Sequence, residues 1–411
     1  MQSPDDIDFL APQTVDDPYP FYAALREHAP VYRLPGTEIY LVAKRPLIED
    51  ALEREADFSA NLTGVLMTGP AGERQVFDLS SFGGTVDAIA NADEPAHAVH
   101  RKLILPHVTP AAIAALEDTF RAWAIELIDP LVNDGGGDWV ARVANPLPTR
   151  AMALVIGLPM GDVDRLVDWA MTGTEILAGT TTPDRMTHVV TKAAEMAGYL
   201  AERVALASRT SNAEPSPDVL GAMVRGISEG LISENDAVSI LVVLVGAGGE
   251  STSSLTGNAV RMLAERRDLQ DALRTDPSLI PDFIEEVLRL ESPFRGHYRH
   301  VNRDTRLGDV DLPEGSRILL LWAAANRDPD TYEDPDSVDL HRPGLRDHLA
   351  FGRGMHFCVG ARLARLEARV IIEELLARTR TFALDPQCPP DYVSSIFVRR
   401  HRTLRLMAHK P

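Results

Sequence analysis

The sequence predicts a mainly α-helical fold with a minor β portion, and two observations carry that prediction. Long stretches repeat apolar residues at intervals of three and four positions, the pattern of helices that bury one face. Strand-like segments are short, and no repeat or low-complexity tract divides the chain. We therefore expect residues 1–411 to form one domain.

Five long segments carry the helical repeat, and three short segments carry the strand pattern. The expected helices are 110–132, 181–207, 234–267, 281–291 and 360–379. The expected strands are 38–44, 316–323 and 403–408. Residues 208–218 are rich in Ser, Asn and Pro, so we expect a surface loop there.

Composition restricts the partners and the compartment. The formal net charge is −19, so the surface as a whole repels nucleic-acid phosphates and argues against such a partner. The first 20 residues carry acid and proline where a signal peptide carries base and an apolar run. The strongly apolar stretch 239–249 is shorter than the roughly 20 residues of a membrane span. We expect a cytoplasmic protein without a membrane anchor.

Two cysteines, Cys358 and Cys388, cannot build a disulfide framework or a multi-cysteine metal site. Three glycines (Gly352, Gly354 and Gly360) surround Cys358, and the last helical pattern follows at once. Glycine allows a sharp turn and a close approach to a flat group, and a helix N-terminus stabilises a thiolate. For an isolated cysteine, a buried structural role would be the simpler interpretation.

The order Phe351-Gly-x-Gly-x-His-x-Cys358-x-Gly resembles the heme-ligand loop of the cytochromes P-450. The resemblance implies heme b (iron protoporphyrin IX), with Cys358 as the axial ligand of the iron. It implies that Phe351, Gly352 and Gly360 lie against this cofactor. It also implies the family's triangular, mostly helical domain with a small sheet-rich lobe, and it extends over essentially the whole chain. Cys388 has no such context.

Two further sets of residues resemble the family. Glu286 and Arg289 stand three apart on a helix, and Arg342 follows downstream, as in the buried ion-pair network of these enzymes. Taken alone, Glu286 and Arg289 are an ordinary helical ion pair. The residues that reach the heme propionates in the family correspond here to His97, Arg101, Arg299 and His356.

The helix at 234–267 contains a segment that resembles the family's oxygen-binding groove. Ala247 and Gly248 would give room over the heme, and Glu250 would feed protons toward bound dioxygen. Ser251 stands where the family usually has threonine, and Thr252 follows it. Either hydroxyl could therefore carry the relay.

The resemblance implies a monooxygenase that inserts one oxygen atom of O2 into a small organic substrate by hydroxylation, dealkylation or epoxidation. The electrons would come from a ferredoxin and its NAD(P)H-dependent reductase. A basic cluster (Lys102, Arg353, Arg362 and Arg365) could receive an acidic ferredoxin. Solvated helix-face charges are the plainer interpretation of that cluster.

The expected substrate pocket combines one helix and one extended segment: Val243, Leu244, Ala247, Phe294, Arg295 and His297. The stretch 62–92 is a further candidate wall. An extended chain places Arg295, His297 and Arg299 on one side, so Arg295 could pair with an anionic or strongly polar substrate. The alternatives are a bulge that turns Arg295 outward and an ion pair between Arg295 and a local acid.

Two other functions remain open from the sequence. A peroxide-driven heme-thiolate enzyme would not need the Glu250–Ser251 relay. A heme-binding sensor or sequestering protein would use the same cysteine loop without turnover. The acid and hydroxyl at Glu250 and Ser251 favour the monooxygenase over both.

Overall fold

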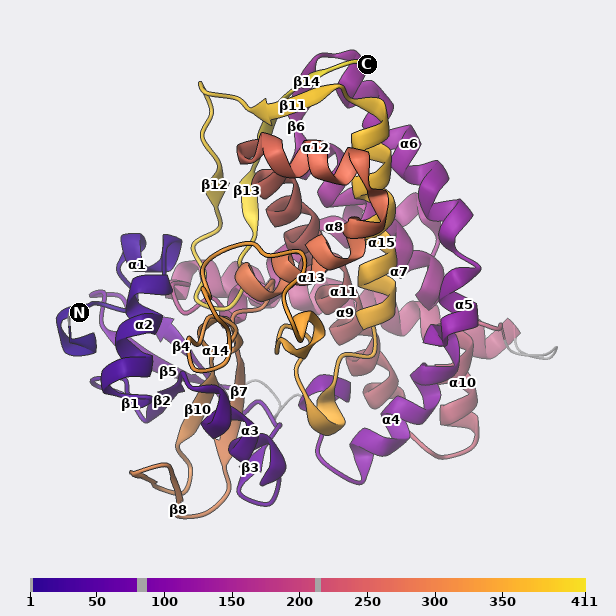
Figure 1. Ribbon diagram of the computed structural model, residues 1–411. Coiled ribbons are helices and arrows are strands. Elements are labelled where there is room, and N and C mark those ends of the chain that lie inside the picture. The colour runs from indigo at the N-terminus through magenta and orange to yellow at the C-terminus, as the bar shows by residue number, and fades with distance from the viewer. Residues whose placement is uncertain (1–2, 80–86, 211–215) are drawn as a thin grey trace.

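Helices carry most of the core in the computed structural model, which describes residues 3–79, 87–210 and 216–411. Figure 1 shows them grouped around α11. The helices are α1 (Pro12–Asp16), α2 (Tyr19–His28), α3 (Arg45–Glu53), α4 (Ala96–Ile104), α5 (Pro110–Ala114), α6 (Glu117–Asn133), α7 (Pro146–Ile156), α8 (Val163–Gly173), α9 (Pro183–Thr210), α10 (Val219–Ser228), α11 (Glu234–Glu265), α12 (Arg267–Thr275), α13 (Ile280–Leu290), α14 (Trp322–Ala325) and α15 (Ala361–Arg378).

The central helix α11 begins with a capping box. The Ser233 hydroxyl accepts from the N–H of Asp236 at 3.1 Å, and the Asp236 carboxylate accepts from the N–H of Ser233 at 2.8 Å. α11 packs against α7, α8, α9 and α15. Among the described helices, it alone has the length and apolar composition of a membrane span, and 56% of its apolar stretch is buried inside the protein. Such burial is typical of a core helix.

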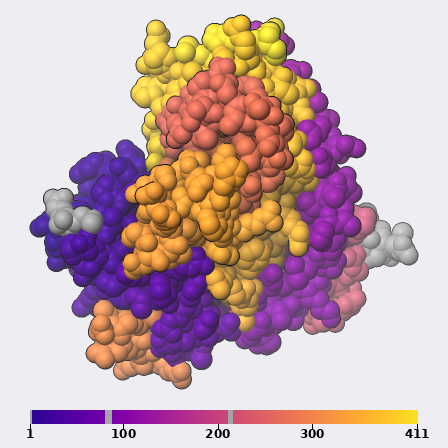
Figure 2. All heavy atoms as spheres, viewed as in Figure 1, coloured from indigo at the N-terminus to yellow at the C-terminus, as the bar shows by residue number. Residues whose placement is uncertain are grey.

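The largest sheet has the order β1-β2-β10-β7-β3. β10 runs parallel to β2 and antiparallel to β7, which places Leu320 opposite His297. This sheet lies beside α1–α3 at the left of Figure 1, and Figure 2 shows the N-terminal segments as one side of the molecule. The strands are β1 (Val31–Arg33), β2 (Ile39–Val42), β3 (Phe58–Ser59), β4 (Gly64–Thr68), β5 (Arg74–Asp78), β6 (Gly136–Asp138), β7 (His297–Val301), β8 (Thr305–Leu307), β9 (Val310–Leu312), β10 (Arg317–Leu320), β11 (Thr381–Leu384), β12 (Asp391–Tyr392), β13 (His401–Thr403) and β14 (Arg405–His409).

The mainly helical class and most predicted elements are confirmed, including β2, β10 and β14. One expected helix, 110–132, is two helices, because the chain turns at Ala115 and Leu116. The apolar period continues through that turn, so the period alone could not locate the break. α9 runs three residues beyond its expected end at 207, to Thr210, and residues 211–215 of the expected loop 208–218 lie outside the described residues.

The candidate wall segment 62–92 contains a hairpin of β4 and β5, and its residues 80–86 lie outside the described part. Among the described residues of this segment, Ile89 and Ala90 line the main cavity. The sequence of 62–92 gave no strand signal strong enough to predict the hairpin.

Candidate functional site

The loop before α15 holds Cys358 in the wall of the main cavity. Gly352 and Gly354 have φ angles of 67° and 71°, a left-handed conformation that strains other residues. The N–H of Cys358 donates to the carbonyl of Phe351 at 2.9 Å and closes the loop. Burial raises the pKa of the Cys358 thiol, and the N–H groups of Gly360 and Ala361 oppose that rise. A bound metal cation would deprotonate such a thiol.

The cavity encloses about 1510 Å³ of empty space, including its opening to solvent. α11, α7, α4, the β7 segment and the cysteine loop all contribute to its wall. The sequence-predicted residues that line it are His97, Arg101, Val243, Leu244, Ala247, Gly248, Ser251, Thr252, Phe294, His297, Arg299, Phe351, Gly352, His356, Cys358 and Gly360. The fold therefore brings most of the predicted site to one cavity.

Four basic side chains gather at this cavity, as the resemblance implies for a group with two carboxylates. The rings of His97 and His356 lie 4.2 Å apart, and Nδ1 of His356 is buried without a partner among the described residues. Arg101 donates to the carbonyl of Phe357 at 2.8 Å, and Arg299 to that of Tyr298 at 2.8 Å. Burial lowers the pKa of Arg299 to about 10. An anion at this place would satisfy the buried groups, so these residues fit the propionates of a heme.

The oxygen-groove segment of α11 is divided between two faces. Ser251 and Thr252 line the cavity, and the Ser251 hydroxyl donates to the carbonyl of Ala247 at 2.6 Å. Glu250 is buried outside the cavity lining, where it accepts from Arg400 at 2.9 Å and from the hydroxyl of Thr174. Burial raises the pKa of Glu250, and Arg400 opposes that rise. No spacing pattern in the chain indicated Arg400 or Thr174 as partners of Glu250.

Gly248 makes room for a side chain as well as for a ligand. A Cβ atom at this position would lie 2.3 Å from Sδ of Met152 on α7. Met152 also lines the cavity. Gly248 therefore lets α7 and α11 approach each other, in addition to opening the groove that the sequence suggested.

The expectation that Arg295 faces the cavity is corrected by the structure. Arg295 is buried outside the cavity lining, and Nε and Nη2 have no partner among the described residues. Burial lowers its pKa, and nearby Tyr22 opposes that shift. The alternation that starts at His297 does not extend back to Arg295. Gly296 comes so close to β10 that an added Cβ would lie 2.4 Å from the carbonyl oxygen of Leu320, and β7 begins only after it.

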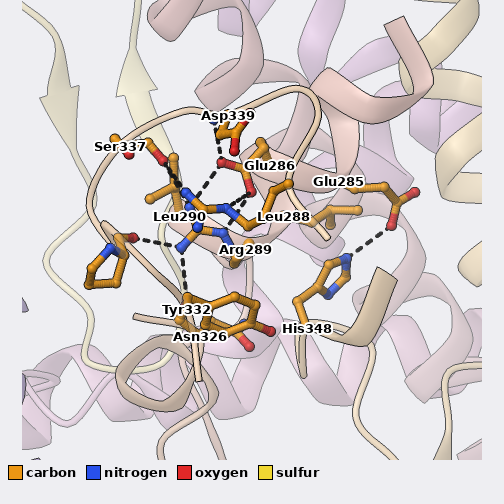
Figure 3. Close-up of polar contacts among 12 residues, drawn as sticks. Glu285, Glu286, Leu288, Arg289, Leu290, Asn326, Tyr332, Ser337, Asp339 and His348 are labelled. Atoms are coloured by element: carbon orange, nitrogen blue, oxygen red, sulfur yellow. Dashed lines mark hydrogen bonds and ion pairs between the residues drawn. The ribbon is translucent and has the colours of Figure 1, made fainter. Parts of the chain in front are cut away.

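Figure 3 shows a buried ion-pair network between α13 and the chain segment that precedes the cysteine loop, as the sequence indicated. Arg289 donates to both oxygens of Glu286, from Nε at 2.7 Å and from Nη2 at 2.9 Å, and both side chains are fully buried. Arg342 and the N–H of Asp339 add bonds to the same carboxylate at 3.2 and 2.9 Å. Arg289 also donates to the carbonyl of Ser337 at 2.9 Å. The network fastens α13 to the segment that precedes the loop.

The neighbouring residue Glu285 forms a second network that the sequence did not reveal. Its carboxylate accepts two bonds from Arg365 on α15, at 2.6 and 2.7 Å, and lies 3.0 Å from Nε2 of His348. These bonds lower the pKa of Glu285 to about 2. They tie α13 to α15 and to the chain before the cysteine loop. The sequence contained one signal for this second network, namely a glutamate directly before Glu286.

Glu367 is another cavity residue that the sequence analysis missed. It lies on α15, lines the cavity, and its Oε2 is buried without a partner among the described residues. Burial raises its pKa well above the ordinary value. The apolar period of α15 gave no sign that this glutamate faces inward.

This burial predicts a dependence of stability on pH. A carboxyl whose folded pKa is raised stabilises the fold fully below its unfolded pKa of about 4.3, and that contribution is lost as the pH rises toward the folded pKa. Compared with Glu367→Gln, the wild type should lose about 1.4 kcal/mol of unfolding free energy for each pH unit in this window. Denaturant unfolding of both proteins at about pH 5 and about pH 7 measures the difference, and parallel curves would contradict it.

Comparisons with known proteins agree over most of the chain. The family model described as Cytochrome P-450 matches residues 180–406. Cytochrome P-450 144 from Mycobacterium tuberculosis is 39% identical over 398 residues, which cover 97% of this chain and 90% of that protein. Cyclomarin C epoxidase CymV from Salinispora arenicola is 32% identical over 384 residues, 93% of each chain. The crystal structure of CalO2 superposes with a TM-score of 0.84 at 26% identity and covers 98% of this chain and 99% of that one.

Proposed function

Because the chain belongs to the cytochrome P-450 family, whose members are heme b monooxygenases, we propose that it inserts one oxygen atom of O2 into a small organic substrate and releases water. The observation that carries this proposal is the sulfur of Cys358 in the wall of a large cavity, with His97, Arg101, Arg299 and His356 gathered at the same cavity. A heme bound through this thiolate would supply the oxidation, since the thiolate favours O–O cleavage. The proposal covers three types of reaction: hydroxylation, dealkylation and epoxidation.

The protein's own residues would hold the cofactor, position the substrate and supply protons. Cys358 would ligate the iron of a bound heme, and the four basic residues would hold its propionates. Val243, Leu244 and Ala247 present an apolar surface to the substrate. We place the enzyme in the cytoplasm as one domain over residues 1–411.

The test is a turnover assay of the purified holoprotein with O2 and a surrogate ferredoxin system, in which hydroxylated, dealkylated or epoxidised product is expected. Product with peroxide alone, or none at all, would favour the peroxide-driven enzyme or the sensor.

The proton relay runs through Glu250 and one of the two cavity hydroxyls. Burial raises the pKa of Glu250, which suits a group that gives up a proton, and Arg400 opposes that rise. Ser251→Ala removes the hydroxyl bonded to the Ala247 carbonyl, and we expect more hydrogen peroxide released per NAD(P)H consumed. The measurement compares peroxide and product yields of Ser251→Ala and Thr252→Ala. Unchanged coupling in the first variant, with loss in the second, would assign the relay to Thr252.

The electron donor is a separate ferredoxin with its NAD(P)H-dependent reductase. Two members of the basic cluster already have acidic partners, since Arg365 pairs with Glu285, and Arg353 pairs with Glu49 at 2.9 Å. Lys102 and Arg362 are exposed and form no ion pair within the described residues. Phe357, 44% exposed, lies beside the cysteine, and Arg101 of α4 donates to its carbonyl. These features suit an acidic partner.

Reversing one exposed charge tests this docking face. We expect Arg362→Glu to weaken ferredoxin-supported turnover and to flatten its dependence on salt, because the mutated face repels an acidic partner. Steady-state rates at several ionic strengths measure the effect. Arg380→Glu is the matched control, because Arg380 is exposed, forms no ion pair within the described residues and follows the opposite end of α15 from Arg362. Equal rates in wild type and Arg362→Glu would overturn the docking face and leave the monooxygenase proposal intact.

A further inference from the structure

His297 stands at the cavity with its position fixed by the sheet. It begins β7, and the antiparallel register pairs it with Leu320 of β10. Trp322 follows two residues later, and its indole Nε1 donates to Nδ1 of His297 at 2.8 Å. Both residues line the cavity.

The bond from Trp322 fixes the protonation of the ring. An indole N–H can only donate, so Nδ1 of His297 must accept and the single proton of the neutral ring lies on Nε2. Burial, together with the charge of Arg299, lowers the pKa of His297 to about 3. The ring is therefore a neutral N–H donor under physiological conditions.

Aromatic contacts hold the ring in one orientation. Phe294 meets it edge to face with centroids 5.8 Å apart, and Phe397 does so at 5.4 Å. Within the described residues, no acceptor bonds Nε2, and the side chain is only half-buried. The ring therefore offers an unused donor at a cavity wall.

Several other polar groups of the cavity are engaged or lie elsewhere, while the Thr252 hydroxyl, Nδ1 of His356 and Oε2 of Glu367 also belong to the lining. Ser251 donates to Ala247, and Arg101 to Phe357. Arg353 pairs with Glu49, and Arg295 lies outside the lining. Much of the remaining wall is apolar, formed by Met152, Val155, Ile156, Val243 and Leu244. A substrate here meets a largely apolar surface, with His297 as a neutral donor that Trp322 fixes in position.

From this arrangement we infer that the substrate is a neutral, largely apolar molecule with a carbonyl oxygen, as in a ketone, ester or amide, and that Nε2–H of His297 binds that oxygen. The inference rests on the proposed function and names its substrate class. A neutral ring does not compensate a carboxylate, so a free acid gains less from His297 than a carbonyl does. The competing acceptor for the same N–H is a heme propionate, and the experiment must separate the two.

Matched pairs of ligands make the test. The holoprotein is titrated calorimetrically with cyclododecanone against cyclododecane and with adamantanone against adamantane, with adamantanecarboxylate as the anionic probe. For each pair, the ratio of hydrocarbon Kd to ketone Kd is compared between wild type, His297→Phe and His297→Gln. The ratio should fall about five- to tenfold in His297→Phe, the value of one hydrogen bond, and be largely kept in His297→Gln, which retains a donor. Heme transfer to excess apomyoglobin is measured in parallel.

The outcomes separate cleanly. A ratio unchanged in His297→Phe, or no ketone bound ahead of its hydrocarbon by the wild type, overturns the inference. Faster heme loss in His297→Phe with an unchanged ratio assigns the donor to the propionate instead. Preference for adamantanecarboxylate over adamantanone also overturns it. A wild type that lacks a thiolate-ligated heme spectrum contradicts the proposed function itself, whereas a normal heme spectrum with an unchanged ratio removes only the role of His297.

Discussion

Cys358→Ser is expected to abolish product formation, because a hydroxyl is a poor substitute for the thiolate that donates electron density to iron. Heme should still enter the cavity, since His97, Arg101, Arg299 and His356 remain to hold the propionates. Absorption spectra of the ferric and the reduced, carbon monoxide-bound protein report the axial ligand, and product analysis reports the activity.

The second cysteine supplies a matched control. Cys388 is exposed and lies outside the cavity lining, so Cys388→Ser removes a thiol without touching the site. It should keep the wild-type spectrum and turnover. Wild-type activity in Cys358→Ser, or a lost thiolate spectrum in Cys388→Ser, would contradict the assignment of the ligand.

Glu286→Gln is expected to lower the free energy of unfolding by about 3–5 kcal/mol, since it leaves Arg289 charged, fully buried and without its carboxylate. That loss is a large share of the roughly 5–15 kcal/mol by which domains are stable. The variant should therefore express poorly and unfold at a lower denaturant concentration. Arg342→Lys, which keeps the charge and loses the planar fork, should cost less.

An exposed ion pair shows whether burial causes the loss. Arg150 bonds Glu126 with two contacts of 3.1 Å, but Glu126 is 59% exposed. Glu126→Gln should cost at most about 1 kcal/mol. Denaturant unfolding of the three variants provides the comparison. Equal losses for Glu286→Gln and Glu126→Gln would mean that the buried network is not a special support of the fold.

Many of the predicted site residues line one cavity, and several of them are local in sequence. The cysteine loop places Phe351, Gly352, His356 and Cys358 within eight residues, and Ser251 and Thr252 lie on one helix, so their neighbourhood follows from the chain itself. Glu286 and Arg289 meet because they stand three apart on α13. Contacts of this kind can be predicted from spacing, because the residues that make them are close together along the chain.

Long-range partners were beyond the reach of these patterns. Arg400 reaches Glu250 across 150 positions of sequence, and Arg365 reaches Glu285 across 80. Neither pair has a fixed spacing, because tertiary packing brings together elements whose separation along the chain is arbitrary. Glu367 was missed for a related reason: which face of α15 turns inward depends on the helices packed against it.

Periodicity and short motifs were enough to predict the helical class, the cysteine loop and the family. The positions of Arg295 and His297 relative to the cavity, in contrast, depend on tertiary packing. The alternation of an extended chain put them on one side, but the close approach of Gly296 to β10 starts the strand at His297 and leaves Arg295 outside the cavity. Strand alternation holds only within one continuous strand. The steric demand of a neighbouring strand sets where that strand begins, and of these two predicted pocket residues His297 lines the cavity and Arg295 does not.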